Sequence, residues 1–317
     1  MHIFFIDPIE KLNLKKDSTF MMALSFQAKG IESYLLFEKD FSIANDQKDS
    51  LLVYAFNGQF KEDGSYIEKF ELKGSRRVFI TGNDCIHMRI DPPYDTRYQR
   101  YLWMLDFLVN RTGVEVLNSP TKIMKYNEKL VALKDLDHSH PSFVGSSLTE
   151  FESFIERIKP DYESVILKPL DLYSGIGVEK ANIDSQLSTK FNKKVIDFKG
   201  AIVCQPFIKD VYEGELRSIY FDGKELGTII KKPNPGEFLA NIAQGAKYEK
   251  YELVGDLKAL CDQVALDLYN DDVRFIAFDL LGGKINEINI TCPGLLVEVS
   301  YACNKNLSSL IADHFIG

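Results

Sequence analysis

The stretch DLLGGKINEINIT, residues 279–291, has a pair of glycines near its middle and carries three side chains that suit a hard metal ion. The residues on the two sides of the glycines predict two β-strands connected by a hairpin turn. Mg²⁺ prefers carboxylate and amide oxygens, and substrate phosphates usually complete its shell. Asp279, Glu287 and Asn289 offer such oxygens, so the hairpin is a candidate metal site.

The register of this hairpin decides whether the three side chains can converge. Side chains alternate between the two faces of a strand, so a shift of one residue moves a side chain to the other face. A two-residue turn would place Asp279 opposite Asn286 and turn Glu287 away. The metal interpretation therefore predicts a three-residue or bulged loop over residues 282–284, which brings Glu287 and Asn289 to the face of Asp279. In the alternative interpretation they form only a polar face on an edge hairpin, which tolerates either register.

The composition is that of a globular protein with room for two or three domains: 317 residues, 45% of them hydrophobic and 26% charged. The net charge of −8 argues against nucleic acid as a partner, because an acidic surface repels phosphate backbones. No apolar run is long enough for a membrane-spanning helix, and the apolar start is too short for a signal peptide. The five scattered cysteines suit reduced thiols, so we expect a cytoplasmic protein.

The first part of the chain has the alternating pattern of a parallel sheet. Residues 2–7 predict a strand, residues 17–30 a helix that ends at Gly30, and residues 33–38 a second strand. Three further short strands are expected over residues 50–57, 65–73 and 76–81, followed by a long amphipathic helix over residues 95–113.

The second part contains strands with polar ends and a glycine-containing loop. Lys168 follows an apolar strand, and the stretch SGIGV, residues 174–178, comes directly after it. A lysine and exposed backbone N–H groups suit a phosphate, but a solvated strand-end lysine and an ordinary hairpin tip have the same appearance. Lys129 at a helix start has the same two interpretations. Asp222-Gly223 predicts a tight hairpin turn.

Two further polar sites in this part also have alternative interpretations. Glu215 and Arg217 alternate on one strand and share a face, which suits a ribose and an anionic oxygen or a surface ion pair. CQPFI, residues 204–208, fits a hinge strand that pairs with an adenine edge, or any strand end. Residues 232–251 form a long loop without a clear period, and we expect a mobile lid there.

Five segments, taken in order along the chain, resemble the prokaryotic glutathione synthetases of the ATP-grasp ligase superfamily. These are residues 7–20, residues 88–98 (MRIDPPYDTRY), residues 117–130 (LNSPTKIMKYNEKL), residues 166–171 (ILKPLD) and the opening hairpin. The resemblance implies an α/β fold with an α+β ATP-binding half. It also implies an N-terminal open mixed or parallel sheet over residues 1–120 that binds the peptide, a small central lid domain over residues 121–203, and an antiparallel-rich metal-binding domain over residues 204–317.

The resemblance also implies a role for individual side chains. Arg217, Asn241 and Lys168 would act at the transferred phosphate, and Asp17, Arg89 and Asp91 would bind the peptide substrate. Asp279, Glu287 and Asn289 would bind two Mg²⁺ ions, with Mn²⁺ as an alternative. ATP would contact Lys129, Lys168, Ser174, Gly175, Gly177, Gln205, Pro206, Phe207, Ile208, Glu215 and Arg217.

The implied reaction joins γ-glutamylcysteine and glycine with ATP, through an acyl phosphate, in a homo-oligomer of two or four chains. The chain departs from the family pattern at two positions that bear on this reaction. Leu172 begins the loop where the family has glycine, and Leu239 stands where it has arginine. Two other hypotheses therefore stay open: a related carboxylate–amine ligase with other substrates, and a nucleotide-binding homologue without ligase activity.

Overall fold

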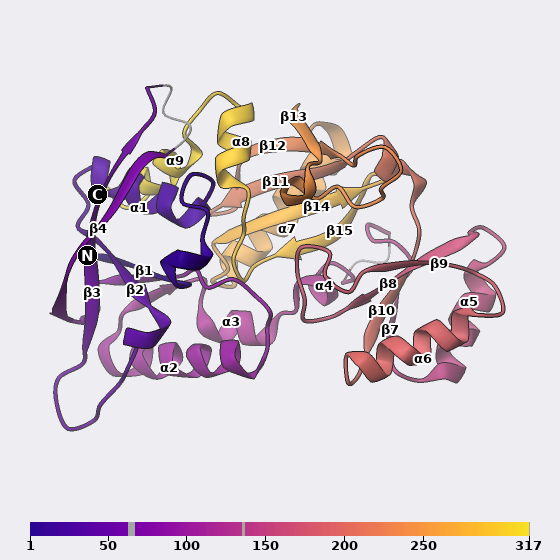
Figure 1. The fold of residues 1–317 in the computed structure, drawn as a ribbon, viewed down its shortest axis with the longest axis horizontal. Helices are drawn as coiled ribbons and strands as arrows, with labels where there is room; N and C mark the ends of the chain where they lie inside the picture. The colour runs from indigo at the N-terminus through magenta and orange to yellow at the C-terminus, as the bar shows by residue number, and fades with distance from the viewer. Residues whose placement is uncertain (63–66, 135–136, 317) are drawn as a thin grey trace.

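Three β-sheets follow one another along the chain in a computed structural model that describes residues 1–62, 67–134 and 137–316. The N-terminal sheet lies at one end of the molecule, a small central sheet lies at the other end, and the third sheet lies between them (Figure 1). The expected α/β class is confirmed. Among the helices of the described ranges, none combines the length and apolar character needed to cross a membrane.

The N-terminal sheet has the strand order β4-β3-β2-β1-β5-β6. Its parallel part comprises β1 (His2–Ile6), β2 (Ser33–Phe37), β5 (Cys85–Met88) and β6 (Glu115–Leu117), of which the alternating pattern predicts β1 and β2. The antiparallel strands β3 (Ser50–Phe60) and β4 (Ile67–Phe79) extend it, and β3 confirms the strand predicted over residues 50–57. The prediction of two separate strands after it is wrong, because residues 67–73 and 76–79 belong to the single strand β4, whose pairing with β3 contains a register shift. Residues 65 and 66 of the second predicted strand lie outside the described residues.

Helix α1 (Ser18–Ala28) confirms the predicted helix of residues 17–30 and shows how its sequence fixes both ends. The Asp17 carboxylate accepts hydrogen bonds from the backbone N–H groups of Thr19 and Phe20, which otherwise lack helical partners. Gly30 has φ +77°, the left-handed conformation that closes a helix C-terminus. The helix is apolar on most sides because it lies in a core shared by the N-terminal sheet, the third sheet and helices α8 (Leu296–Ala302) and α9 (Leu307–Asp313).

The central sheet is antiparallel, in the order β7-β10-β8-β9. Its strands are β7 (Phe143–Gly145), β8 (Ser164–Pro169), β9 (Glu179–Asn182) and β10 (Ile202–Pro206). Helices α5 (Leu148–Ile158) and α6 (Leu187–Asp197) cover one face, where the rings of Phe151 and Phe191 stack 4.0 Å apart. The division at residue 203 stays a prediction, and β10 crosses that boundary as part of the central sheet.

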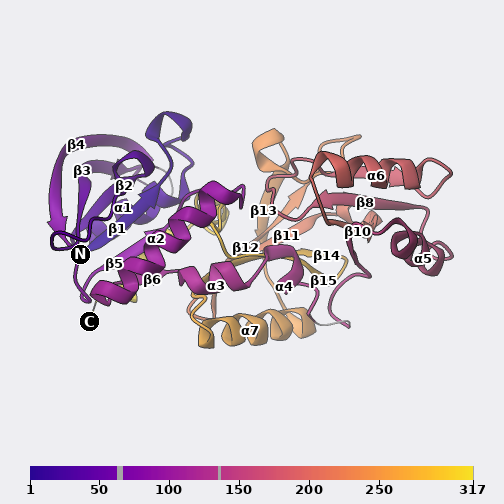
Figure 2. The same cartoon turned by 90° about the horizontal axis from the view of Figure 1, so that it is seen from below.

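The third sheet is also antiparallel, in the order β13-β12-β11-β14-β15. It contains β11 (Glu215–Phe221), β12 (Lys224–Lys232), β13 (Lys247–Tyr251), β14 (Phe275–Leu281) and β15 (Lys284–Asn289). Helix α7 (Gly255–Asn270) packs on one face, and Figure 2 shows it below this sheet, with α2 (Thr96–Thr112) along the N-terminal sheet. Asp222 and Gly223 both have positive φ, which confirms the predicted turn between β11 and β12.

The long loop of residues 232–251 is not irregular throughout. Its last five residues form β13, which pairs with β12 at the edge of the third sheet, and residues Ile242–Gln244 form a short 3-10 turn. The charged and aromatic residues of Lys247–Tyr251 suit an exposed edge strand, but they have no strict alternation that would predict a strand from the sequence. The expected lid function stays a prediction.

Two short helices separate the N-terminal sheet from the central sheet. They are α3 (Pro120–Lys125) and α4 (Glu128–Val131), and the chain between them is extended at Tyr126 and Asn127. The Asn127 side chain accepts hydrogen bonds from the N–H groups of Lys129 and Leu130, so it restarts the helix as an N-cap. This restart fixes the position of Lys129 at the inner end of α4.

Candidate active site

The hairpin of β14 and β15 brings the three expected metal ligands together, although not through the predicted loop. The turn itself has only two residues, Gly282 and Gly283, whose φ angles of +53° and +72° fit a tight turn. Three residues after Gly283, Asn286 is an unpaired bulge in β15, so Asp279 pairs with Glu287. The predicted three-residue or bulged loop over residues 282–284 is therefore wrong in place, because the extra residue lies in β15 and not in the loop. The predicted convergence is confirmed: the Asn289 Nδ2 lies 3.0 Å from the Asp279 Oδ2.

The carboxylate of Asp279 is buried and surrounded by donors. The Arg217 Nη1 lies 2.6 Å from one of its oxygens, and the Lys231 Nζ lies 2.9 Å from the other. Burial raises the pKa of Asp279, but the two cations outweigh it and hold that pKa at about 2. Asp279 is therefore ionised throughout the neutral range, which a metal ligand requires.

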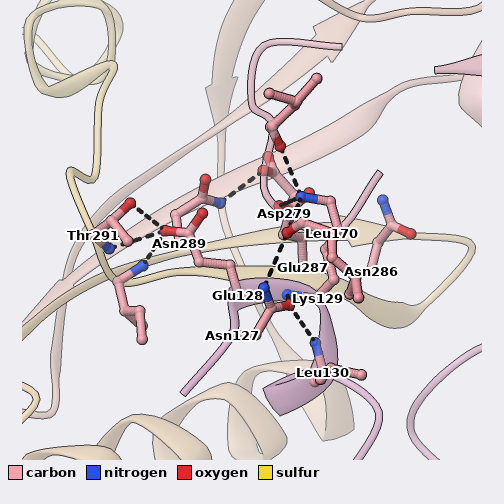
Figure 3. Close-up of polar contacts among 12 residues, drawn as sticks. Asn127, Glu128, Lys129, Leu130, Leu170, Asp279, Asn286, Glu287, Asn289 and Thr291 are labelled. Atoms are coloured by element: carbon pink, nitrogen blue, oxygen red, sulfur yellow. Dashed lines mark hydrogen bonds and ion pairs between the residues drawn. The ribbon is translucent and has the colours of Figure 1, made fainter. Parts of the chain in front are cut away.

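Lys129 and Glu287 form an ion pair at the start of α4. The Lys129 Nζ lies 3.2 Å from the Glu287 Oε1 and donates to the carbonyl oxygen of Leu172 at 2.8 Å. The neighbouring Glu128 accepts hydrogen bonds from the backbone N–H of Thr291, at 2.9 Å, and from its hydroxyl group, at 2.7 Å (Figure 3). Glu128 thus ties α4 to the end of the β14–β15 hairpin, and this link fixes where Lys129 meets Glu287.

The strands of the central sheet contribute the second half of the cavity. Lys168 in β8 is 6% exposed, and burial lowers the pKa of its ammonium group against the opposing effect of Glu287. The segment from Gln205 to Ile208, which includes the last two residues of β10, lines the same cavity. Glu215 at the start of β11 pairs with the Lys231 Nζ at 2.8 Å, while burial raises its pKa. The cavity therefore lies between the central and third sheets.

The glycine-containing loop after β8 also borders this cavity, with one exception. Ser174 and Gly175 line it, and the carbonyl oxygen of Ser174 accepts a hydrogen bond from the Asn241 Nδ2 at 2.9 Å. Gly177 does not line it. A Cβ at Gly177 would lie 2.6 Å from the Phe198 ring, so this glycine permits close packing at the end of α6. Its expected contact with ATP stays a prediction.

One cavity collects nearly all the residues expected to bind ATP and metal. Its lining includes Lys129, Lys168, Ser174, Gly175, Gln205, Pro206, Phe207, Ile208, Glu215, Arg217, Asn241, Asp279, Glu287 and Asn289. The three residues expected to bind the peptide, Asp17, Arg89 and Asp91, line a second cavity. Asp91 lines both cavities. The two cavities are thus adjacent, which a transfer of phosphate between bound substrates requires.

Lys231 is the residue of this site that sequence reasoning missed. A regular β11–β12 hairpin would place Lys231 on the opposite face from Glu215, but a register shift opposite Ile219 and Tyr220 brings the two residues into a pair. The two lysines at the end of β12 are the sequence feature that could have pointed to this residue. The bulge that turns Lys231 toward the site has no recognisable sequence pattern.

The fold is that of the ATP-grasp ligases. The D-cycloserine synthetase DcsG superposes with a TM-score of 0.68 at 12% identity, over 98% of this chain and 99% of that one. The ATP-grasp ligase PsnB, complexed with a minimal precursor, Mg and ADP, superposes with a TM-score of 0.60 at 13% identity, over 99% of this chain and 97% of that one. These similarities define the class of the protein as an ATP-grasp fold.

The chain belongs to the prokaryotic glutathione synthetase family. Residues 1–124 match the family's N-terminal domain, and residues 128–304 match its ATP-grasp domain. The glutathione synthetase of Prochlorococcus marinus (strain MIT 9313) is 30% identical over 94% of this chain and 92% of its own length, and that of Vibrio cholerae is 28% identical over 97% and 94%. The expected family and the expected enzyme class, an ATP-dependent, ADP-forming ligase, are confirmed.

Proposed function

We propose that this ligase joins γ-glutamylcysteine to glycine and forms glutathione, ADP and phosphate. The observation that carries the proposal is the convergence of Asp279, Glu287 and Asn289 beside Lys129 and Lys168, at the border of a second polar cavity. Family membership and the named relatives support the same reaction.

The proposed reaction has two steps. A carboxylate oxygen of the peptide attacks the γ-phosphorus of ATP, and ADP leaves. The amine of glycine then attacks the acyl carbon of the acyl phosphate, loses one proton and displaces inorganic phosphate. The side chains contribute position and charge, because Lys129, Lys168 and Arg217 surround the place where phosphate charge would gather.

The residues of the hairpin fit Mg²⁺, because one ionised carboxylate, a second carboxylate and an amide oxygen form a hard donor set. Asp279, Glu287 and Asn289 would hold two such ions, with Mn²⁺ as an alternative, and bound ions would offset the charge of the ATP phosphates. Glu287 lies between Asp279 and Lys129, a position that suits a ligand shared by two ions. The other site roles are proposals of the same kind: Gln205 to Ile208 at the adenine, Glu215 at the ribose, and Asn241 and Arg217 at the transferred phosphate.

The test is ADP release with γ-glutamylcysteine, measured with and without glycine, together with detection of the tripeptide product. We expect release that requires both substrates and one tripeptide per ADP. ADP release with another peptide or amine, but not with this pair, would replace the proposal with a different ligase reaction. ATP binding without ADP release for any pair would indicate a homologue without ligase activity.

One observation favours the second candidate, a ligase for a different substrate pair. Leu239 lines the ATP cavity and packs on Gly175 where the family has an arginine, so one expected cation is missing near the phosphates. A panel of dipeptides and amines in the same ADP assay separates the two candidates. The expected dimer or tetramer stays part of the proposal, and sedimentation measures it directly.

A further inference from the structure

A histidine–cysteine cluster lies in the N-terminal sheet, outside both cavities of the active site. His2 in β1 is the parallel neighbour of Cys85 in β5, and Phe4 is the neighbour of His87. Residues two apart on a strand point to the same face, so His2, Cys85 and His87 share one face. A possible ligand atom of each lies within 4.8 Å of those of the other two.

Two distances between the possible ligand atoms of this cluster are close to the distances between ligand atoms around one metal ion. The His2 Nδ1 lies 3.0 Å from the His87 Nε2, and the Cys85 Sγ lies 3.8 Å from the same nitrogen. Around a tetrahedral Zn²⁺ bound at roughly 2.1 Å by nitrogen and 2.3 Å by sulfur, neighbouring ligand atoms lie about 3.4 Å apart. Shifts of a few tenths of an ångström would convert these two contacts into two edges of such a site.

The surroundings favour a neutral, dry cluster. Cys85 is 3% exposed and His87 is 1% exposed, and the ring of Phe4 stacks on His87 at 4.4 Å. Phe26 and Phe315 pack against the half-buried His2, so access from solvent runs past this residue. Burial lowers the pKa of both imidazoles, to about 4 for His2, so each has a free lone pair at neutral pH.

We propose that His2, Cys85 and His87 form a second metal site, specific for a thiophilic d¹⁰ ion, Zn²⁺ or Cu⁺. One thiolate and two imidazoles are a soft donor set, unlike the oxygen ligands of the β14–β15 hairpin. As the metal–Sγ bond forms, the Cys85 thiol releases its proton to solvent. With Cu⁺ the three-coordinate site is neutral overall, and with Zn²⁺ a water molecule reaching the ion past His2 completes a tetrahedron. Without a metal, the same three side chains form a buried hydrogen-bonded cluster.

The experiment uses the full chain, stripped with a chelator, in excess Mg²⁺ so that the oxygen site is filled. Zn²⁺ and, under a reductant, Cu⁺ are titrated separately against a chromophoric chelator. We expect one tightly bound ion per chain for at least one metal, and a loss of affinity of at least about tenfold in Cys85→Ser, because that variant lacks a ligand. Co²⁺ as a probe for Zn²⁺ should give a thiolate charge-transfer band that Cys85→Ser lacks.

Two further variants keep the test independent of folding. His2→Gln changes a half-buried side chain at the chain start and should weaken binding in the same way. Cys303→Ser, at a cysteine outside the cluster, should leave it unchanged. The proposal is overturned if the wild-type chain binds neither ion at one equivalent, or if His2→Gln or a folded Cys85→Ser binds as tightly as wild type.

Discussion

Asp279 and Glu287 face each other across β14 and β15 because β15 contains one extra residue, Asn286, that has no partner in β14. The bulge shifts the register by one residue and turns Glu287 to the side of Asp279. Arg217 pairs with Asp279 from the neighbouring strand β11, so three adjacent strands deliver charge to one place. The local irregularity of one strand therefore sets the geometry of the proposed metal site.

Removing either hairpin carboxylate should abolish most activity. We expect Asp279→Asn and Glu287→Gln to lower kcat by about two to three orders of magnitude, because each loses a charge that would hold a metal ion at the phosphates. ADP release measures the rate, and Mn²⁺ binding followed by electron paramagnetic resonance measures the site directly. Asp267→Asn, the same change at an exposed position of α7, is the matched control. Near wild-type turnover in either hairpin variant would contradict the metal assignment.

We expect Lys231 to matter for activity as much as Lys129 and Lys168, the two lysines that the sequence analysis named. Its ammonium group is buried between Asp279 and Glu215, so Lys231→Met leaves the buried Asp279 and the partly buried Glu215 without this partner. Breaking a buried pair in this way typically costs about 3–5 kcal/mol of folding free energy. We expect a clear fall in Tm together with a loss of ADP release.

The neighbouring Lys232 provides the control for that change. Its side chain is exposed and pairs with Glu249 at the sheet edge, so Lys232→Met should change the free energy of unfolding by less than about 1 kcal/mol. Equal effects of the two substitutions on Tm and on ADP release would show that position 231 has no special role. The comparison is read from thermal unfolding and from the ADP assay under the same conditions.

The sequence predicts the regular elements of this fold well, because their signals are local. Asp17 and Gly30 mark the ends of α1, and Asp222-Gly223 marks a tight turn, since each acts through its own backbone. The two bulges that assemble the site could not be predicted. A bulge depends on how a strand pairs with its neighbour. The sequence of β15 alone therefore does not show that Asn286 is a bulge, and the sequence of β12 alone does not show that Lys231 pairs with Glu215.

The glycine-containing loop shows a second limit of the same kind. Gly175 and Gly177 both have positive φ and look equivalent in the sequence. Only the packing separates them, because Gly175 borders the cavity beside Leu239 and Gly177 lies against Phe198. Resemblance to the family predicts that both glycines belong to this loop. It does not predict which of them borders the cavity, because that depends on contacts with residues distant in the chain.

The alkaline limb of the activity profile should depend on Lys168. Burial lowers the pKa of its ammonium group below the ordinary lysine value of 10.5, and the group is charged only below that pKa. The kcat/KM for ATP should therefore fall as pH rises through this lowered pKa, since that ratio reports on the free enzyme. Lys168→Arg should move the fall to higher pH, because guanidinium stays charged. An unchanged alkaline limb in Lys168→Arg would exclude Lys168 as the titrating group.

The two glycines of the loop should respond differently to the same substitution. In Gly175→Ala the new Cβ meets Leu239 at 3.1 Å and the residue keeps φ +76°, which costs roughly 1–2 kcal/mol for a residue with a side chain. Because this loop borders the cavity, we expect a rise of about tenfold in the KM for ATP, together with a small fall in Tm from the backbone strain. In Gly177→Ala the Cβ lies 2.6 Å from Phe198, so the loss should appear in Tm instead. Gly200→Ala, where a Cβ meets nothing within 4 Å, should change neither quantity. If Gly177→Ala raised the KM for ATP at unchanged Tm, then Gly177 would face the nucleotide after all.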